Sequence, residues 1–382
     1  MAYALLVASA FLFELALDLP VGSLPLALDG DGASHGAVAA AMGSGMVAAL
    51  LASLPLGILV DRAGRLPVMK VTAITGAASL LGLTFVRGAP GDSALLALRS
   101  IVFIGFMTAE FAYAGDLASP DRAVSTVATL GMVGTLTYAV APAAGIELWQ
   151  HGVGREQYAW AAALALAGFG LLWALPPDRL RAPRPAKRQV LLRPEWVPAV
   201  AFGLTAVLQA GVNGSLAVLT FHDRGIANAA ALFSASAISV FALRYAVGRL
   251  IERLGPRPFA LAVAVAQLAA CLLAARAHTL SEVILAGILL GIGWAGGTPV
   301  MIALLFETTT GQTRGAAMGA YNFASNAGAS LGAVLATLAT LTGGGYALAI
   351  TIAGLAPFSV MPFILRSRPP GRPLLREAPA RG

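Results

Sequence analysis

The chain reads Gly57-Ile58-Leu59-Val60-Asp61-Arg62-Ala63-Gly64-Arg65 between its second and third long apolar stretches. After a shift of 191 residues, half of its 382, the pattern returns as Gly248-Arg249-Leu250-Ile251-Glu252-Arg253-Leu254-Gly255. At the same offset Asp116 corresponds to Glu307, and each acid precedes a short polar turn that ends in arginine. The sequence therefore indicates two related halves, and a duplication of this kind places function at the interface between them.

The composition indicates a protein whose solvent is lipid. Apolar residues make up 58% of the chain and charged residues 11%, with a mean hydropathy of +0.80. A membrane-spanning helix needs about 20 mostly apolar residues. We expect an all-α membrane protein with twelve such helices, at 3–26, 37–60, 67–86, 93–117, 124–147, 158–175, 196–220, 228–250, 258–275, 281–306, 315–341 and 343–365.

The basic residues predict the orientation of these helices. With the N-terminus inside, 19 of the 25 basic residues fall in cytoplasmic segments. Arg99 and Arg244 lie inside the membrane, and the outer side holds only Arg87, Arg155, Arg224 and Arg276. This asymmetry fits the positive-inside rule and predicts that both termini are cytoplasmic, in a multi-pass protein of the inner membrane. Because topology accounts for the net charge of +7, we expect no nucleic-acid partner.

Several classes of site are disfavoured. The first apolar run has no preceding lysine or arginine and contains Glu14 and Asp18, so we expect a retained helix rather than a secretory signal. Cys271 is the single cysteine, which excludes an internal disulfide, and the four histidines fall in outer loops without ligand spacing. We expect no metal and no cofactor. Neither a nucleophile with a base nor a Walker-type phosphate loop is present, so we expect a non-enzyme driven by an ion gradient.

The proline-rich segment after the sixth helix divides the chain. We expect an N-terminal six-helix bundle at 1–175, a cytoplasmic linker at 176–195, a C-terminal six-helix bundle at 196–366 and a disordered basic cytoplasmic tail at 367–382. Glycines spaced by four residues, Gly287/Gly291, Gly293/Gly297 and Gly328/Gly332, predict that the helices at 281–306 and 315–341 pack closely.

The whole chain resembles the major facilitator superfamily. Gly57, Leu59, Asp61, Arg62, Gly64 and Arg65 match the family's Gly-x-Leu-x-Asp-Arg-x-Gly-Arg signature between helices 2 and 3. The resemblance implies a loop that closes the cytoplasmic side, in which the aspartate meets the start of helix 11 and the arginines reach Asp116. It implies the same, more loosely, for the second half. The gate residues would be Gly57, Asp61, Arg62, Gly64, Arg65, Asp116, Arg244, Glu252, Arg253 and Glu307.

Two further family motifs match less closely. Arg99 resembles the family's helix 4 arginine, although the glycine that usually follows is displaced to Gly105. In the fifth helix, Gly131, Gly134, Pro142 and Gly145 are similar to the Gly-Pro-x-x-Gly-Gly element of the antiporter branch. Ala141 and Ile146 stand where that element has glycine. The alternative is an ordinary proline kink.

Acids inside the membrane are the candidate coupling groups. Glu14 and Asp18 lie one turn apart on one face of the first helix. An unpaired acid at the bilayer centre costs roughly 2.5 kcal/mol or more, so these groups must meet water, a cation or a proton. We interpret them as a proton carrier, and the alternative is a structural pair held by Arg99 or Arg244. Glu110, on the same face of its helix as Arg99, is either an intermediate proton stop or the partner of a neighbouring helix.

The resemblance implies that helices 1, 4, 7 and 10 line a central cavity. Polar and aromatic side chains on those helices, and on helix 11, are candidates for the substrate site: Glu14, Asp18, Arg99, Glu110, Gln209, Asn213, Trp294, Asn322 and Asn326. Acids in one half and amides in the other suit a cationic or zwitterionic molecule. The alternative for the amides is hydrogen bonding between helices, and for Trp294 it is ordinary packing.

We therefore expect a monomeric secondary transporter that works by alternating access in the lipid bilayer. The favoured interpretation is proton-coupled export of a small organic solute or drug, with the proton gradient as energy source. A proton-coupled uptake symporter or facilitator for a small polar metabolite is the alternative within transport. A membrane sensor or scaffold that has kept the fold without transport is the alternative from another class.

Overall fold

Each expected apolar stretch forms a long helix or helical run in the computed structural model, which describes residues 1–117, 123–177, 193–307 and 314–366. The first half consists of α1 (Ala2–Gly30), α2 (His35–Ala63), α3 (Arg65–Phe85), α4 (Ala89–Leu117), α5 (Ala123–Gln150) and α6 (Gln157–Leu171). The second half consists of α7 (Val197–Val212), α8 (Val218–Asp223), α9 (Ala231–Leu254), α10 (Pro256–Arg276), α11 (Leu280–Phe306), α12 (Arg314–Leu341) and α13 (Gly345–Arg366).

Short helical segments extend these rods. The 3₁₀ turns Gly154–Glu156 and Leu172–Ala174 flank α6, the turn Pro194–Trp196 precedes α7, and the π-helical segment Asn213–Ala217 joins α7 to α8 into one span. Ten helical runs in the described residues are long and apolar enough to cross a membrane. With α5 and α9, of 28 and 24 residues, they make the twelve rods of an all-α membrane fold.

The helix ends follow from local chemistry. Ser34 accepts a hydrogen bond from the Ala37 backbone N–H at the start of α2, and Thr279 forms a capping box with Glu282 at the start of α11. Gly64 and Gly255 end α2 and α9 with φ of 93° and 82°. A positive φ disfavours any residue with a Cβ, which explains why the repeated sequence pattern closes on glycine in both halves.

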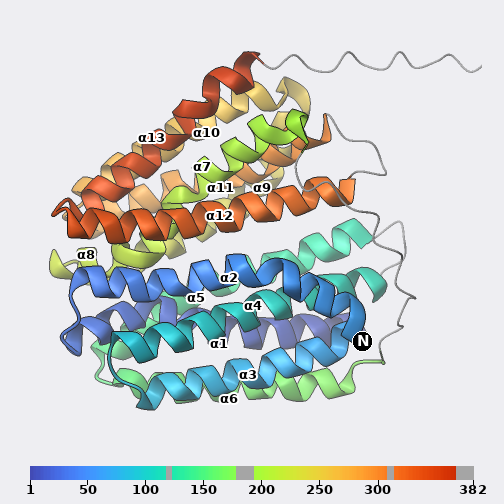
Figure 1. Ribbon diagram of the computed structural model, residues 1–382, viewed down its shortest axis with the longest axis vertical. Coiled ribbons are helices and arrows are strands. Elements are labelled where there is room, and N and C mark those ends of the chain that lie inside the picture. The colour runs from blue at the N-terminus through green and yellow to red at the C-terminus, as the bar shows by residue number, and fades with distance from the viewer. Residues whose placement is uncertain (118–122, 178–192, 308–313, 367–382) are drawn as a thin grey trace, which may run out of the picture.

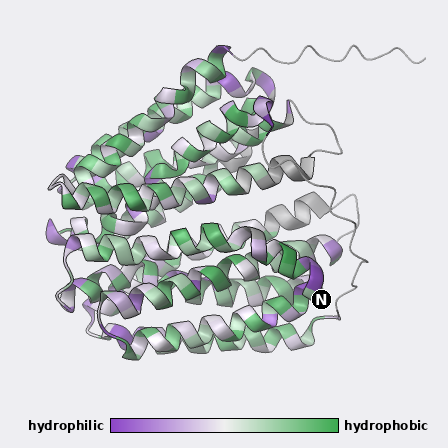
Figure 2. Cartoon of the chain, viewed as in Figure 1, coloured by the Kyte–Doolittle hydropathy of each residue, from purple (hydrophilic) through white to green (hydrophobic). Residues whose placement is uncertain are grey.

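The two halves form separate bundles that lie against each other (Figure 1). α1 to α6 form one layer, and α7 to α13 form the other. Hydrophobic residues run along the helices of both bundles (Figure 2), and many large apolar side chains are exposed, as a lipid-facing protein requires. The expected linker at 176–195 falls largely outside the described residues, and the expected tail at 367–382 falls wholly outside them.

Small residues set the closest helix contacts. A Cβ on Gly22 of α1 would lie 2.0 Å from the Pro142 carbonyl oxygen of α5, and one on Gly332 of α12 would lie 1.9 Å from the Leu208 carbonyl oxygen of α7. On α11, Gly287 and Gly291 face the backbone of α9 in the same way. The helices expected to pack closely, 281–306 and 315–341, make little contact with each other and pack instead on other helices: α11 on α9 and α10, and α12 on α7 and α2.

Candidate functional site

A buried polar cluster lies between α1, α4 and α5. Arg99 of α4 places Nη2 3.7 Å from Asp18 Oδ1, and its Nε donates to the Leu17 carbonyl of α1. The other Asp18 oxygen accepts a hydrogen bond of 3.0 Å from the Thr137 hydroxyl of α5. Asp18 thus has a cation and a hydroxyl as partners, and its charge is balanced inside the bundle.

Glu14 is held differently from its neighbour Asp18. Its carboxyl group lies beside that of Glu110 on α4, and both side chains are buried, at 1% and 0% exposure. In the described part of the chain no donor reaches Glu14 Oε2 or either carboxyl oxygen of Glu110. Two ionised carboxylates are both acceptors, so this contact forms a hydrogen bond only when one of them carries a proton.

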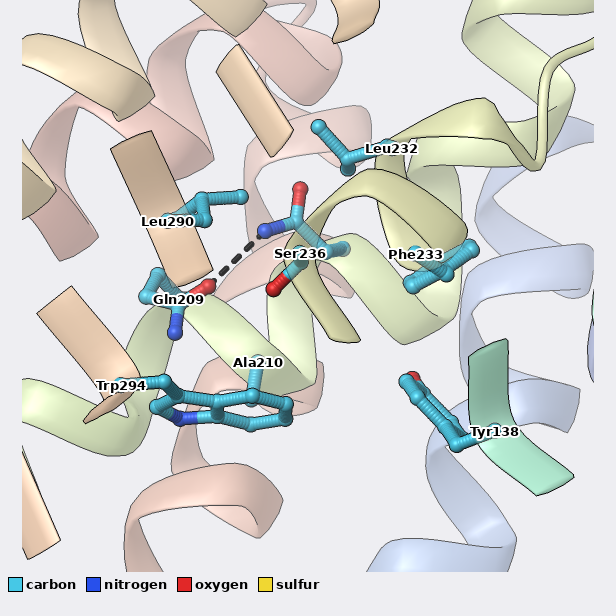
Figure 3. Close-up of a pocket in the computed structure, with 9 residues that line it drawn as sticks. Tyr138, Gln209, Ala210, Leu232, Phe233, Ser236, Leu290 and Trp294 are labelled. Atoms are coloured by element: carbon cyan, nitrogen blue, oxygen red, sulfur yellow. Dashed lines mark hydrogen bonds between the residues drawn. The ribbon is translucent and has the colours of Figure 1, made fainter. Parts of the chain in front are cut away.

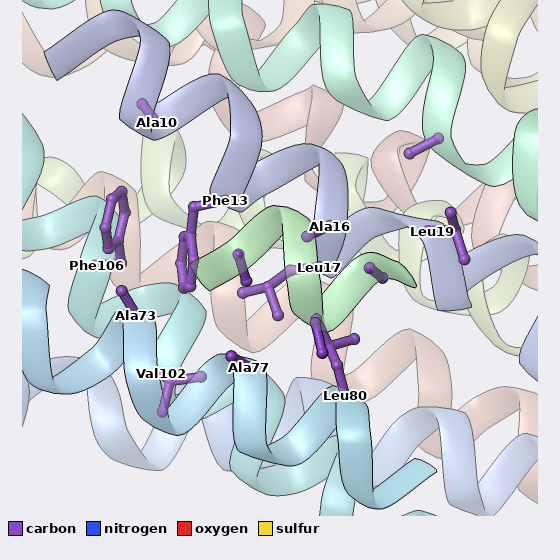
Figure 4. Close-up of a cluster of buried hydrophobic side chains, with 14 of the residues drawn as sticks. Ala10, Phe13, Ala16, Leu17, Leu19, Ala73, Ala77, Leu80, Val102 and Phe106 are labelled. Atoms are coloured by element: carbon purple, nitrogen blue, oxygen red, sulfur yellow. The ribbon is translucent and has the colours of Figure 1, made fainter. Parts of the chain in front are cut away.

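The surroundings of this carboxyl pair are apolar. Phe13, next to Glu14, stacks against Phe106, one turn from Glu110, with ring centroids 4.1 Å apart (Figure 4). On the α5 side, a Cβ at Gly134 would lie 3.1 Å from Glu14 Oε2. A site this dry strongly favours a neutral carboxyl over a charged one unless a cation enters.

Tyr138 of α5 connects the polar cluster to the second half. Its hydroxyl lies close enough to Asp18 and Arg99 to interact electrostatically with both charged groups. Its ring meets Phe233 of α9 edge-on at 5.5 Å and Trp294 of α11 at 6.5 Å between centroids. The side chain therefore contacts the second half of the protein from the first.

Three adjoining hollows surround Trp294 (Figure 3 shows the first). The first lies beside Gln209 and Tyr138, the second beside Thr135 and Pro299, and the third beside Gln267 and Met301. Because Tyr138 and Thr135 belong to α5 and the other lining residues to the second half, the first two hollows lie on the interface between the halves. They are the candidate substrate site.

A chain of hydrogen bonds orients Gln209 at this site. The Tyr346 hydroxyl of α13 donates to Asn213 Oδ1 over 2.7 Å, and Asn213 Nδ2 donates to Gln209 Oε1 over 2.9 Å. Asn213 begins the π-helical segment, and π-helical turns inside a helix are frequent at functional sites. With its oxygen engaged, Gln209 turns its amide nitrogen toward Trp294 (Figure 3).

The acids expected at the gate, Asp116 and Glu307, each form an ion pair within their own half. Arg65 Nε lies 3.2 Å from Asp116 Oδ2 in the first half. In the second half, Arg257 binds Glu307 through two hydrogen bonds of 3.0 and 2.9 Å. Arg257 takes the place relative to Glu307 that Arg65 takes relative to Asp116, which shows the internal repeat at the level of single contacts.

Other expected gate residues stand apart from these pairs. Asp61, Arg62 and Arg253 are exposed, and a Cβ on Gly57 would meet no described atom within 4 Å. The side chains of the gate residues Arg244 and Glu252, and that of the substrate-site candidate Asn322, lie outside the described part of the structure. Asn326 lies on α12, where its carbonyl accepts a hydrogen bond from Ser330.

Contacts between the halves fix the end of the molecule remote from the gate. Polar contacts there join His35 to Asp223 at 3.4 Å and the Gln150 amide to the Ala227 carbonyl. Nearer the middle of α2 and α12, the Ser330 hydroxyl donates to the Met46 carbonyl over 2.9 Å. Toward the gate end of α2, Leu51 and Ile58 are exposed, at 72% and 54%. The halves are therefore joined at the end that holds His35, and α2 is uncovered toward the end that holds Asp61.

Sequence reasoning missed Tyr138, Thr137 and Arg155. Tyr138 lies on the helical stripe of Gly134, Pro142 and Gly145, so the glycine pattern of this helix could have revealed it. Arg155 carried no such signal, because its partners come from three different elements. It binds Asp92 of α4 with two bonds of 2.8 Å, Asp31 after α1 at 2.6 Å, and the carbonyls of Leu83 and Val86 at the end of α3.

Comparison with known proteins agrees with this fold. The sequence profile of the Major Facilitator Superfamily matches residues 6–224 and 199–381. The nucleoside transporter NupG superimposes with a TM-score of 0.77 at 15% identity, over 96% of this chain and 100% of the other. The human organic anion transporter MFSD10 (TETRAN) gives 0.68 at 18%, over 96% and 99%.

A bacterial homologue of the human lysosomal transporter Spinster, solved in an inward-facing and occupied conformation, gives a TM-score of 0.71 at 13% identity, over 95% of this chain and 94% of the other. At these identities the likeness concerns the fold. No curated protein matches the chain in sequence.

Proposed function

Because the chain belongs to the major facilitator superfamily, we propose that it is a proton-coupled exporter of small organic cations or zwitterions that works by alternating access. The observation that carries the proposal is the carboxyl pair of Glu14 and Glu110, two neighbouring acids that are almost fully buried with no cation beside them in the described residues. A buried acid pair that holds one proton can release it when a cationic substrate arrives, and this exchange is the elementary step of antiport.

Asp18 has a second role in this proposal. Its ion pair with Arg99 and its hydrogen bond from Thr137 tie α4 and α5 to α1. Protonation of Asp18 would release Arg99 and loosen that connection. The acid pair of Glu14 and Glu110 would then exchange the proton, while Asp18 would link its charge state to the packing of the three helices.

The ion pairs at the gate end have a role in the proposed alternating-access cycle. We assign Arg65–Asp116 and Arg257–Glu307 to a latch that keeps the end of each half ordered while the bundles separate. Asp61 and Arg62, exposed in this conformation, are placed to contact the opposite half when that end closes. Together with the contacts around His35, this arrangement supports a state open to the side that holds Asp61, which the basic residues assign to the cytoplasm.

The test is proton flux in liposomes that contain the purified protein and a pH-sensitive dye. Ethidium and 1-methylnicotinamide serve as cationic probes, and betaine serves as a zwitterion. We expect at least one probe to evoke proton movement opposite to its own. Glu14→Gln and Glu110→Gln should abolish this flux because neither variant leaves a carboxyl pair to share the proton, and Asp18→Asn should reduce it.

Glu147→Gln is the matched control, because Glu147 is exposed and pairs only with His151 in the described structure. It should leave the flux unchanged. Coupled flux that survives in both Glu14→Gln and Glu110→Gln would contradict the proposed coupling groups. Probe movement in the same direction as the proton would favour the uptake symporter, and a complete absence of probe movement would contradict export of cations and zwitterions.

A further inference from the structure

We infer that the hollows around Trp294 form a subsite for an uncharged, planar ring that carries a hydrogen-bond acceptor. The inference rests on the proposed function and specifies the substrate. The exported molecule would combine such a ring, bound in the second half, with a cationic or polar group directed toward the acids of the first half.

The walls of the hollows favour an uncharged group. None of the described residues that line the three hollows is charged. Asp18 and Arg99 neutralise each other, and neither they nor Glu14 and Glu110 line the three hollows. An ionic group placed beside Trp294 would lose its hydration without finding a counter-ion, whereas an uncharged ring would lose little.

Aromatic side chains from both halves favour a planar group. Tyr138 of α5 and Trp294 of α11 have ring centroids 6.5 Å apart and planes inclined by 51°. Phe233 of α9 meets the far edge of Tyr138. Flat rings pack against such faces more favourably than saturated rings of the same area, because offset and edge-to-face contacts use the ring quadrupole.

Gln209 supplies the polar contact. Its oxygen accepts from Asn213, which Tyr346 holds in turn, so the amide nitrogen is the end left for a ligand. In the described part of the chain this nitrogen has no hydrogen-bond partner, and it points toward Trp294 (Figure 3). A donor fixed in this way selects a carbonyl oxygen or a ring nitrogen on the ligand and rejects a group that can only donate.

The sizes of the hollows suit a ligand made of a ring and a single acceptor atom. The hollow beside Gln209 has a volume of about 20 Å³, enough for roughly one water-sized group. The hollow on the Thr135 side of Trp294 has a volume of about 170 Å³. The acceptor atom would occupy the small hollow next to Gln209, and the ring would occupy the larger one against Trp294.

Three probes of similar size separate the contributions of charge, planarity and the acceptor. Nicotinamide is a neutral planar ring with an amide carbonyl, 1-methylnicotinamide adds a positive charge, and cyclohexanecarboxamide keeps the amide on a saturated ring. Binding to the purified full-length protein is measured by saturation-transfer NMR, which detects weak ligands. We expect nicotinamide to bind and cyclohexanecarboxamide to bind at least about fivefold more weakly.

Variants locate the binding. Gln209→Leu should weaken nicotinamide about fivefold to tenfold, the effect of one lost hydrogen bond. Trp294→Leu should weaken it about tenfold, and Trp294→Phe should restore most of the affinity. Two control variants on α6 should leave nicotinamide binding unchanged. Gln157→Leu removes a buried glutamine that donates to the Gly154 carbonyl, and Trp160→Leu removes an exposed tryptophan. Thermal unfolding of each variant shows whether it is folded.

Failure of the inference can be told from failure of the proposed function. If nicotinamide does not bind, or binds equally well to folded Gln209→Leu and Trp294→Leu, the ring subsite is wrong. Proton flux evoked by 1-methylnicotinamide and lost in Glu14→Gln would still support the exporter. If nicotinamide binds at Trp294 and Gln209 as expected and no probe moves protons, the ring subsite stands and proton-coupled export does not.

Discussion

Arg155 shows how a single side chain can join elements that are distant in sequence. Its guanidinium is 5% exposed and binds two carboxylates and two backbone carbonyls at the ends of α1, α3 and α4. In the second half a different arginine, Arg224, makes a comparable contact between elements. Arg224 donates to the Ala277 carbonyl at the end of α10, the position that corresponds to Val86 after the shift of 191 residues.

Removal of Arg155 tests the value of this contact. Arg155→Leu leaves Asp92, which is fully buried, without a counter-ion, so we expect a loss of about 3–5 kcal/mol in the free energy of unfolding. The measurement is thermal unfolding of the purified protein. Arg87→Leu, an exposed arginine at the same end, should stay near the wild type.

The double variant Arg155→Leu/Asp92→Leu separates the charge from the packing. It removes both ions, so it should recover part of the stability lost in the single variant. Equal stability of Arg155→Leu and the wild type would show that this buried cluster does not stabilise the first half.

At the scale of elements, α7 and α12 make an especially close backbone contact. A Cβ on Gly211 would lie 1.9 Å from the Ala329 carbonyl oxygen, and one on Gly332 would lie 1.9 Å from that of Leu208. Because the obstacle on both sides is backbone, neither helix can adapt by turning a side chain. The two glycines therefore set the distance between these helices and the position of Gln209 on α7.

Substitution at this contact should separate the helices. Gly332→Ala pushes the new methyl group into the α7 backbone, so we expect a lower unfolding temperature and weaker binding of nicotinamide through displaced Gln209. Gly170→Ala on α6 is the control, since a Cβ there meets no described atom within 4 Å. It should be neutral or stabilising by up to about 1 kcal/mol, the helix preference of alanine over glycine. The same behaviour in both variants would contradict the assigned role of Gly332.

At the scale of the whole molecule, the two halves are joined at one end. His35 of α2 and Asp223 of α8 meet across the interface, at the same end as the contact of Gln150 with Ala227, and the contact of Met46 with Ser330 joins the halves nearer the middle of the helices. An alternating-access cycle has to break these contacts each time the protein opens toward that side. A covalent link across the same position should therefore stop the cycle.

Cross-linking tests this expectation. With His35→Cys/Asp223→Cys, a bifunctional methanethiosulfonate reagent should join the halves and abolish movement of the cationic probes, and a reducing agent should restore it. Cys271 is fully buried, so it should contribute little background. Glu147→Cys/His151→Cys, within one turn of α5, should react without loss of transport. Transport that continues after complete cross-linking of the first pair would contradict rocking of the halves about the central site.

The chain itself determined the twelve helices, their caps and the repeat. Apolar run length, Ser34 and Thr279 as caps, and Gly64 and Gly255 as turn residues act within a few positions of sequence, so their effects could be read directly. The pairing of Arg65 with Asp116 could be expected only through the family resemblance. Spacing on one helix also placed Glu14 near Asp18, but it could not assign their partners.

The tertiary structure alone decided those partners. Asp18 meets Arg99 and Thr137, while Glu14, a single turn away, meets Glu110 and no cation in the described residues. Tyr138 and Gln209 come to the same cavity from opposite halves, 71 positions apart in the chain. Hydrophobic periodicity fixes which face of a helix is buried, whereas the contact made by a buried polar group depends on the rotation and depth of its neighbours, which packing sets.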